Sequence, residues 1–278
     1  MLDQNRWIVK GLLVNRPVKD LVRTHAFTLI ELLVSMAIVG VLAGLILPAI
    51  QGAREASRRM SCQNNLHNHA LAILSFEHTY GYLPVGRNRR SDIDWSWGFY
   101  ILPMLEQSNV YLGADQRKAW DDPSNSKVVN VTLPVFRCPS SAKQFIGDCD
   151  YAGLTGTIQG VLAGNSPFNR GSLVHVNSSD QSEIPLASVT DGTSNTLCVS
   201  ESHDLLSPIG RWASGLNCVS HNLGGINSTL EGIRSLHVGG ANAVSLDGAT
   251  VFLPNNIDQE VLTSLLTRSG NEPMSTEQ

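Results

Sequence analysis

The chain has 278 residues, of which 42% are hydrophobic and only 16% are charged, and its formal net charge is -4. This size and apolar content are sufficient for a buried core, and they exclude a chain that is disordered throughout. The slight acidic excess provides no positive field to attract a phosphate backbone, so we expect no nucleic-acid partner.

A continuous apolar segment occupies residues 32–50, with the sequence LLVSMAIVGVLAGLILPAI and no charged side chain. At about 1.5 Å per residue, a helix of this length approaches the roughly 30 Å hydrocarbon core of a bilayer. The segment is longer than the apolar region of an ordinary signal peptide and continues into a helical pattern. We therefore expect one transmembrane helix.

Glu31 is a lone carboxylate at the start of this apolar segment. Burying it in a membrane without a partner costs about 2 kcal/mol or more. Two interpretations stay open at this point: the side chain lies at the level of the lipid headgroups, or it pairs with a positive charge supplied by another subunit. The mainly basic leader before it favours a cytoplasmic N-terminus, although Arg54, Arg58 and Arg59 follow the segment on the other side.

Residues 25–34, HAFTLIELLV, closely resemble the prepilin-type N-terminal cleavage and methylation motif. The resemblance implies that a prepilin peptidase cuts between Ala26 and Phe27, methylates the new amino group of Phe27, and leaves Glu31 to neutralise that amine on a neighbouring subunit. Family members usually have glycine before the cut, whereas this chain has the small residue Ala26, so the efficiency of cleavage stays open. The implied partners are the peptidase, other pilin or pseudopilin subunits and the inner membrane.

After Pro48, which is expected to kink the helix without ending it, the helical pattern resumes over residues 51–80. We expect the helix to end near Thr79, because Gly81 and Pro84 are stop signals. His67 and His69 are two residues apart and cannot bind one ion together, so we expect both to be solvated. The apolar residues at helical spacing, which should face a sheet, are Ala56, Met60, Leu66, Ala70, Ile73 and Leu74.

Residues 81–268 alternate short β-rich runs with clusters of Gly, Asn, Ser, Asp and Pro, which is typical of an antiparallel sheet with long loops. The clearest local pattern is AVSL, then Asp247-Gly248, then ATVFL, which predicts a hairpin with a two-residue type I′ turn. Residues 269–278 are expected to be a disordered tail. The aromatic residues Trp95, Trp97, Phe99 and Tyr100 are interpreted as the core face of a strand rather than as a carbohydrate platform.

The five cysteines contain no CxxC pair and no Cys/His cluster at zinc spacing, so a disulfide of open connectivity is preferred to a metal site. We expect no cofactor. Calcium is the alternative left open, because Asp148 with Asp150, or Asp121 with Asp122, offers only fragments of an oxygen cage.

His237 and Asp247, with a serine such as Ser235 or Ser194, invite a hydrolase interpretation. The chain has no GxSxG elbow and no defined order of triad residues, so we interpret Asp247 and Gly248 as turn residues and His237 as structural.

The motifs CQNNL at 62–66, CPS at 138–140, TDGTSNTL at 190–197 and His237-x9-Asp247-Gly248 together resemble the DUF1559 family, over about residues 25–268. These proteins join a prepilin-type N-terminus to a domain that ends in an H-x9-DG element. The resemblance implies an α+β, pilin-like fold: a long N-terminal helix, first membrane-embedded and then amphipathic, packed on an antiparallel sheet. Because Cys62 and Cys138 lie in the two cysteine-bearing motifs, it also implies that they pair.

The predicted organisation is a cleavable leader (1–26), a transmembrane prepilin helix (27–50), an amphipathic continuation (51–80), the β-rich domain and the tail. We expect a non-enzymatic pseudopilin-like subunit or accessory of a type II secretion or type IV pilus-like assembly. It would be a single-pass membrane protein with its C-terminal domain periplasmic or extracellular. The alternative is a membrane-tethered protein that binds a sugar or peptide and uses the prepilin signal for targeting.

Overall fold

The computed structural model describes residues 27–88, 93–141, 146–157, 171–173, 175–176, 183–203, 209–221, 224–228 and 232–270. The leader with Ala26 and residues 271–278 lie outside the described residues. The chain divides into two compact units, Met1–Ile50 and Gln51–Gln278, which are considered separately below.

One helix, α1 (Leu29–Tyr80), contributes to both units and contains Pro48 without ending there. Its C-terminus lies one residue beyond the expected Thr79. Gly81 follows it with a φ of +84° and donates its backbone N–H to the carbonyl oxygen of Glu77 at 2.7 Å. This conformation is strained for any residue with a Cβ, which explains why the helix stops at a glycine.

Within the first unit, every described residue from 27 to 50 is exposed, although nearly all of these residues are apolar. Leu29 is 80% exposed and Leu45 is 70% exposed. Among the described helices, α1 is long and apolar enough to cross a membrane. The described residues of this unit leave the surface uncovered, so lipid or other helices must cover it.

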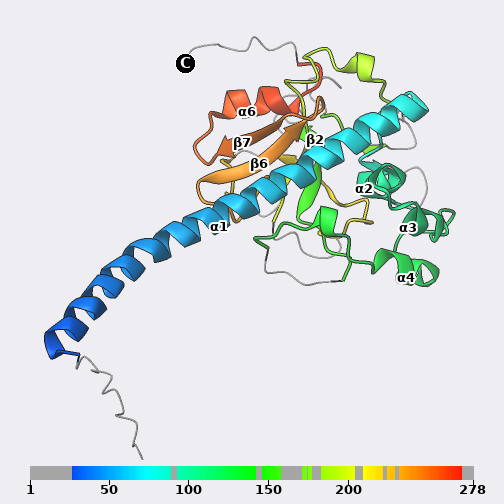
Figure 1. Cartoon of the computed structure of the whole chain (residues 1–278). Coiled ribbons are helices and arrows are strands. Elements are labelled where there is room, and N and C mark those ends of the chain that lie inside the picture. Colours follow the sequence, from blue (N-terminus) through cyan, green and yellow to red (C-terminus); the bar gives the residue numbers. More distant parts are fainter. Residues whose placement is uncertain are drawn as a thin grey trace, which may run out of the picture. The chain divides into compact units, whose positions relative to one another are not determined.

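The second unit is built on a mixed but mainly antiparallel sheet (Figure 1). Within the described residues, five strands pair in the order β5-β2-β4-β6-β7, and only the β2–β5 pair is parallel. A separate two-stranded parallel pair joins β1 and β3. The strands are β1 (Arg87–Asn88), β2 (Tyr151–Thr157), β3 (His175–Val176), β4 (Leu197–Glu201), β5 (Cys218–His221), β6 (Gly240–Ser245) and β7 (Thr250–Pro254).

The sheet separates two hydrophobic cores. The larger core contains the second half of α1 and the segment with the short helices α2 (Trp97–Tyr100), α3 (Ser108–Leu112) and α4 (Ser126–Val129). The smaller core contains α6 (Gln259–Leu266), whose Leu262 and Leu266 are buried among sheet residues such as Leu154. Figure 1 shows α1 running across the sheet near β6 and β2. The α+β, pilin-like arrangement predicted from the sequence is confirmed.

The buried face of α1 differs in part from the expected stripe. Leu66, Ala70 and Ile73 are buried as predicted, but Ala56 and Met60 are exposed. Four residues outside the predicted stripe are buried instead: Cys62, His69, Ala72 and Phe76. The shift arises because the face in contact with the sheet is selected by packing partners, which apolar spacing alone does not reveal.

His69 is the clearest departure from expectation, because it is completely buried rather than solvated. Its ring stacks on Phe136 with centroids 4.9 Å apart and meets the edges of Trp97 at 5.5 Å and Tyr151 at 5.1 Å. Burial lowers the pKa of His69 to about 3, and an interaction with the backbone of Val135 opposes this shift only in part. The imidazole therefore acts as a neutral aromatic residue of the core.

The aromatic cluster is core, as predicted, but it is not a strand. Trp95 forms an isolated bridge with Ser214, and Trp97 begins the short helix α2, which Ser96 caps by accepting a hydrogen bond from the Phe99 N–H. Trp95 and Phe99 stack with centroids 3.9 Å apart. Serine before a short apolar run thus favoured a helix turn where alternation suggested a strand.

The predicted hairpin is present as β6 and β7, but its turn is not a two-residue type I′ turn. Gly248 has a φ of +90°, whereas Asp247 is not among the non-glycine residues with positive φ. The Gly248 N–H donates to the Ser245 carbonyl at 3.0 Å, and the Ser245 N–H donates to the Ala249 carbonyl at 3.0 Å. This is a three-residue loop over 246–248 with a glycine bulge, which needs positive φ at one residue only.

The neutral, buried state of His69 predicts an acid-sensitive fold. Its folded pKa lies below its unfolded value near 6.5, so stability is intact above that value and falls as the pH drops below it. When the pH falls from about 7.5 to 5, His69 alone should decrease the free energy of unfolding by about 2 kcal/mol. Urea unfolding of the detergent-solubilised full chain, followed by tryptophan fluorescence, measures the loss.

The variant His69→Phe should lose less unfolding free energy than the wild type over this pH range. The matched control is His78→Gln, because His78 is exposed on the same helix and should leave the pH dependence unchanged. An identical pH slope in His69→Phe and the wild type would contradict the assignment.

Candidate functional site

The start of α1 carries the residues implicated in processing and assembly. Phe27 is 70% exposed. The Thr28 backbone N–H and its hydroxyl both donate to Glu31 Oε2, at 2.9 and 2.8 Å, while the Glu31 N–H donates to Thr28 Oγ1 at 3.3 Å. This reciprocal pattern is a capping box, in which the two side chains satisfy backbone donors at the helix start.

Glu31 is the single ionisable side chain between residues 27 and 50. The capping box holds its carboxylate at the same end of the helix as Phe27, where cleavage would create an amino group. A carboxylate in this position can accept a further donor from outside the chain. The roles of Phe27 and Glu31 in processing and assembly remain predictions.

A second candidate region lies where α1 crosses the β6–β7 hairpin, within the second unit. Four polar side chains of α1 recur every four residues, along one ridge of the helix, and each contacts the hairpin or the segment just before it. The contacts are Glu55 Oε1 with His237 Nδ1 (2.6 Å), the Arg59 guanidinium with the Phe252 ring centroid (3.6 Å), Gln63 Nε2 with Asn242 Oδ1 (3.1 Å), and His67 Nδ1 with the Gly248 carbonyl oxygen (2.7 Å).

This ridge explains the spacing of the H-x9-DG element. His237 precedes the six-residue strand β6 and Gly248 follows it, so the two residues lie at opposite ends of a strand about 20 Å long. Their partners Glu55 and His67 are separated by three to four turns of α1, or about 18 Å. The two lengths match, and the element therefore fastens both ends of β6 to one helix.

His237 lies between two carboxylates. Its Nδ1–H donates to Glu55, and its Nε2 lies 3.1 Å from Glu201 Oε1. Burial by itself lowers the pKa of His237, but the hydrogen bonds and charges of Glu201 and Glu55 outweigh burial, and the net pKa is raised. Glu201 Oε2 accepts hydrogen bonds from the backbone N–H and the side-chain amide of Asn242, at 2.8 and 3.1 Å.

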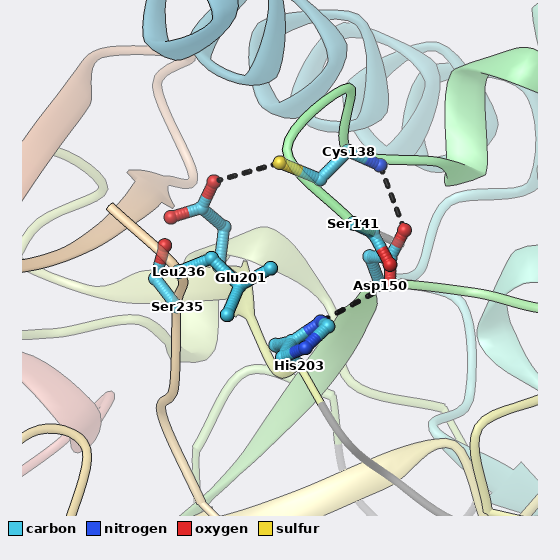
Figure 2. Close-up of a pocket in the computed structure, with 7 residues that line it drawn as sticks. All are labelled: Cys138, Ser141, Asp150, Glu201, His203, Ser235 and Leu236. Carbon is cyan, nitrogen blue, oxygen red and sulfur yellow. Dashed lines mark hydrogen bonds and ion pairs between the residues drawn. The ribbon is translucent and has the colours of Figure 1, made fainter. Parts of the chain in front are cut away.

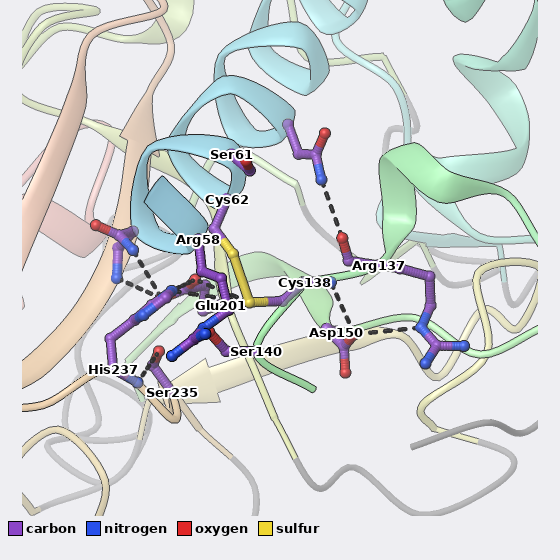
Figure 3. The surroundings of a disulfide bond; sticks show 12 residues. Arg58, Ser61, Cys62, Arg137, Cys138, Ser140, Asp150, Glu201, Ser235 and His237 are labelled. Atoms are coloured by element: carbon purple, nitrogen blue, oxygen red, sulfur yellow. Dashed lines mark hydrogen bonds and ion pairs between the residues drawn. A yellow bond between two sulfur atoms is a disulfide. The ribbon is translucent and has the colours of Figure 1, made fainter. Parts of the chain in front are cut away.

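The Cys62–Cys138 disulfide adjoins this histidine (Figure 3). It joins α1 to the loop before β2, with the two Cα atoms 5.4 Å apart. The other three cysteines, Cys149, Cys198 and Cys218, are free and buried. Burial raises the pKa of Cys198 to about 12 and also raises the pKa values of the other two, so these thiols are poor nucleophiles.

The disulfide, the histidine and a carboxylate together form a group of potential metal ligands. The Sγ atoms of Cys62 and Cys138, one carboxylate oxygen of Glu201 and a ring nitrogen of His237 all lie within 4.8 Å of one another. All four residues are buried. Sequence spacing gave no sign of this group, because its members come from α1, from the loop before β2, from β4 and from the segment before β6.

A small pocket adjoins the group and is lined by Cys138, Asp150, Glu201 and His203, among others (Figure 2). Asp150 Oδ2 accepts the Cys138 N–H at 2.9 Å, and His203 Nδ1 lies 3.6 Å from Asp150 Oδ1. Desolvation acts against the ionised form of Asp150, but its hydrogen bonds with His203 and the Cys138 backbone and the charge of Arg137 lower its pKa overall.

The aspartates considered for calcium have other neighbours. Arg137 Nη1 lies 3.8 Å from Asp148 Oδ2, and Arg137 Nε lies 3.4 Å from Asp150 Oδ2. Asp122 caps a short 3₁₀ turn by accepting the Ser124 N–H at 2.8 Å. The Arg137 guanidinium thus lies close to both carboxylates and compensates part of their negative charge.

The structure separates the residues of the hydrolase interpretation. Asp247 Oδ1 accepts hydrogen bonds from Ser245 Oγ and from the Ala249 N–H, both at 2.9 Å, within the hairpin loop. His237 lies at the other end of β6, and the Ser235 hydroxyl accepts the His237 backbone N–H at 3.1 Å. His237 and Asp247 therefore do not form a catalytic dyad.

Comparison with known protein families gives a match for this chain. The family described as "protein of unknown function (DUF1559)" matches residues 51–222. The chain belongs to the DUF1559 family. The match ends before the H-x9-DG element, so it covers Cys62, Cys138 and Glu201 but not His237. No curated protein and no solved structure matches the chain.

The prokaryotic N-terminal methylation motif matches residues 22–47 of this DUF1559 protein. Together with the apolar first half of α1, this match identifies a pilin-like or pseudopilin-like protein anchored by one N-terminal helix. Its processing and its assembly with other pilins are implied by the motif.

The two carboxylate partners of His237, Glu55 and Glu201, were missed from the sequence. Glu201 had a detectable signal, because it is the single charged residue of the otherwise uncharged strand LCVSE. A charge that ends a fully buried strand needs a partner nearby. Glu55 had no such signal, since acidic side chains are common on solvated helix faces.

The disulfide predicts a large contribution to stability. It closes a loop with a sequence separation of 76. Loop closure of this length in the unfolded chain corresponds to about 4 kcal/mol, and measured effects are about 2–4 kcal/mol. The double variant Cys62→Ser/Cys138→Ser should therefore lose about 3 kcal/mol of unfolding free energy in the presence of a metal chelator.

The control for this measurement is Cys198→Ser, since Cys198 is a buried free thiol that donates to the Val244 carbonyl at 3.4 Å, as a serine also can. A reductant should destabilise the wild type and the Cys198→Ser variant but leave the double variant unchanged. Equal sensitivity of all three proteins to the reductant would show that the bond contributes nothing.

Proposed function

We propose that this DUF1559 protein is a non-enzymatic minor pilin or pseudopilin, cut before Phe27 and assembled with other subunits through the first half of α1. The observation that carries the proposal is an uninterrupted apolar helix surface, exposed along residues 27–50, that carries a single charge at its start. Lipid covers such a surface before assembly, and neighbouring helices cover it afterwards.

Glu31 is the specificity element of this helix. In the isolated chain its carboxylate accepts hydrogen bonds from Thr28 alone among the contacts of the described residues. In an apolar environment, an ionised carboxylate gains most from a second, positively charged partner. The methylated amino group of Phe27 on a neighbouring subunit provides that charge and fixes the axial position of one helix against the next.

We infer the membrane topology from the charge of the leader and from the disulfide. The mainly basic leader favours a cytoplasmic N-terminus before cleavage. The Cys62–Cys138 disulfide fits a second unit that folds in an oxidising compartment, outside the cytoplasm. We therefore assign the second unit to the periplasmic or extracellular side, where it acts as an interaction module in a type II secretion or type IV pilus-like assembly.

The test is N-terminal and intact-mass analysis of the protein from host membranes, combined with chemical cross-linking. The wild type should begin at N-methylated Phe27 and give cross-linked multimers. The variant Glu31→Ala keeps the cleavage site, so it should still be cut, but the yield of multimers should fall at least about tenfold, because the partner of the amino group is missing.

Glu77→Ala is the matched control, since Glu77 is a second glutamate of α1 far from the apolar half, and multimers should persist. A wild-type chain that begins at Met1 would refute prepilin processing. It would favour the alternative of a membrane-tethered binding protein for a sugar or peptide. Normal cross-linking of Glu31→Ala would instead refute the assembly role of the carboxylate alone.

A further inference from the structure

We propose that the reduced form of this protein binds one zinc ion through Cys62, Cys138, Glu201 and His237, and that formation of the Cys62–Cys138 disulfide excludes the metal. The same two sulfur atoms serve both states. In the second unit, α1 would thus be joined to the loop before β2 either by a disulfide or by a zinc ion. This inference concerns the second unit and does not depend on pilin assembly.

Three of the donor separations lie in or close to the range of a tetrahedral zinc site. Cys138 Sγ lies 3.7 Å from His237 Nε2 and 3.8 Å from a Glu201 oxygen, and His237 Nε2 lies 3.1 Å from Glu201 Oε1. Zinc bonds of about 2.0–2.3 Å in a tetrahedron place neighbouring donor atoms about 3.3–3.8 Å apart. Once the disulfide is reduced, the Cys62 thiolate needs only to move away from Cys138 to complete the set.

The donor chemistry selects the metal. Two thiolates, one imidazole and one carboxylate suit a borderline-soft ion such as Zn²⁺ and do not suit calcium or magnesium, which require oxygen ligands. All four side chains are buried, as in a closed structural site. The four ligands come from four separate segments, so the ion would join the two segments that the disulfide joins and, in addition, β4 and the segment before β6.

The surrounding hydrogen bonds orient two of the ligands. Glu55 accepts the Nδ1–H of His237 at 2.6 Å, which leaves Nε2 to face the sulfur atoms. Carboxylate, histidine and metal in this order form the usual arrangement in zinc proteins. Asn242 donates two hydrogen bonds to Glu201 Oε2, which leaves Oε1 toward His237 and Cys138. Neither glutamate is therefore an incidental neighbour.

The exchange between the two states balances in atoms and electrons. Zinc binding to the dithiol form releases the two thiol protons as both sulfurs become thiolates. Oxidation by a disulfide-containing oxidant then transfers two electrons from the two thiolates to that oxidant, which takes up two protons and leaves as a dithiol. The Cys62–Cys138 bond forms, and Zn²⁺ is released.

The experiment titrates the full chain in detergent with Zn²⁺ against a competing chelator, after reduction by a phosphine that is then removed without oxygen. We expect one zinc per chain in the reduced protein and at least about 100-fold weaker binding in the disulfide form. With Co²⁺ as a second probe, the reduced protein should show thiolate-to-cobalt charge-transfer and tetrahedral absorption bands. Equal zinc affinity in both redox forms would overturn the proposal.

Variants locate the site. His237→Ala and Glu201→Gln should each weaken zinc binding by about 10-fold or more, and Glu55→Gln should weaken it by about 10- to 100-fold as an outer hydrogen-bond partner. The control Cys198→Ser should bind as the wild type does. Unchanged affinity in Cys62→Ser/Cys138→Ser would show that any bound zinc lies elsewhere and would refute the assignment.

A readout on the wild-type chain keeps the test independent of variant folding. Zinc should slow alkylation of both Cys62 and Cys138 in the reduced protein at least about tenfold, as measured by peptide mapping. Cys149, Cys198 and Cys218 should react slowly with or without zinc, because burial raises their pKa values. Alkylation of Cys62 and Cys138 at the same rate with and without zinc would refute the site.

Discussion

The docking of the second half of α1 across the sheet is the contact on which the second unit depends. One bond of this contact is covalent, between Cys62 and Cys138, and the others are the polar ridge from Glu55 to His67 and the aromatic packing around His69. Because a helix and a hairpin are each unstable alone, their mutual burial is what makes both persistent. The larger core lies beneath this crossing.

The two halves of α1 share one helical backbone but differ in how they expose or bury their apolar side chains. The first half exposes apolar side chains that water cannot solvate favourably, and the second half buries a face that includes Leu66 and Ile73. Both halves belong to one helix, which continues through Pro48. For a pilin-like protein, this means that the element that anchors the chain is also the element on which the folded unit is built.

The buried group around His237 combines charge compensation with a sulfur pair that can change its redox state. A histidine between Glu55 and Glu201 neutralises part of the negative charge, and the neighbouring sulfur pair can be oxidised to a disulfide or reduced to two thiols. Glu201 needs a positive partner in either case, because an unpaired buried carboxylate is costly. The DUF1559 match includes three of the four potential ligands, and the H-x9-DG segment supplies the fourth.

Local features were determined by the sequence alone: the apolar segment, the end of α1 near Gly81 and the β6–β7 hairpin all follow from neighbouring residues. The tertiary structure decided which face of α1 is buried, why His69 is neutral, which loop type places Gly248, and how Glu55 and Glu201 converge on His237. The physical reason is the distance along the sequence between the residues that interact. Turns and caps are satisfied within a few residues, whereas burial and charge pairing depend on partners that only the folded chain brings together.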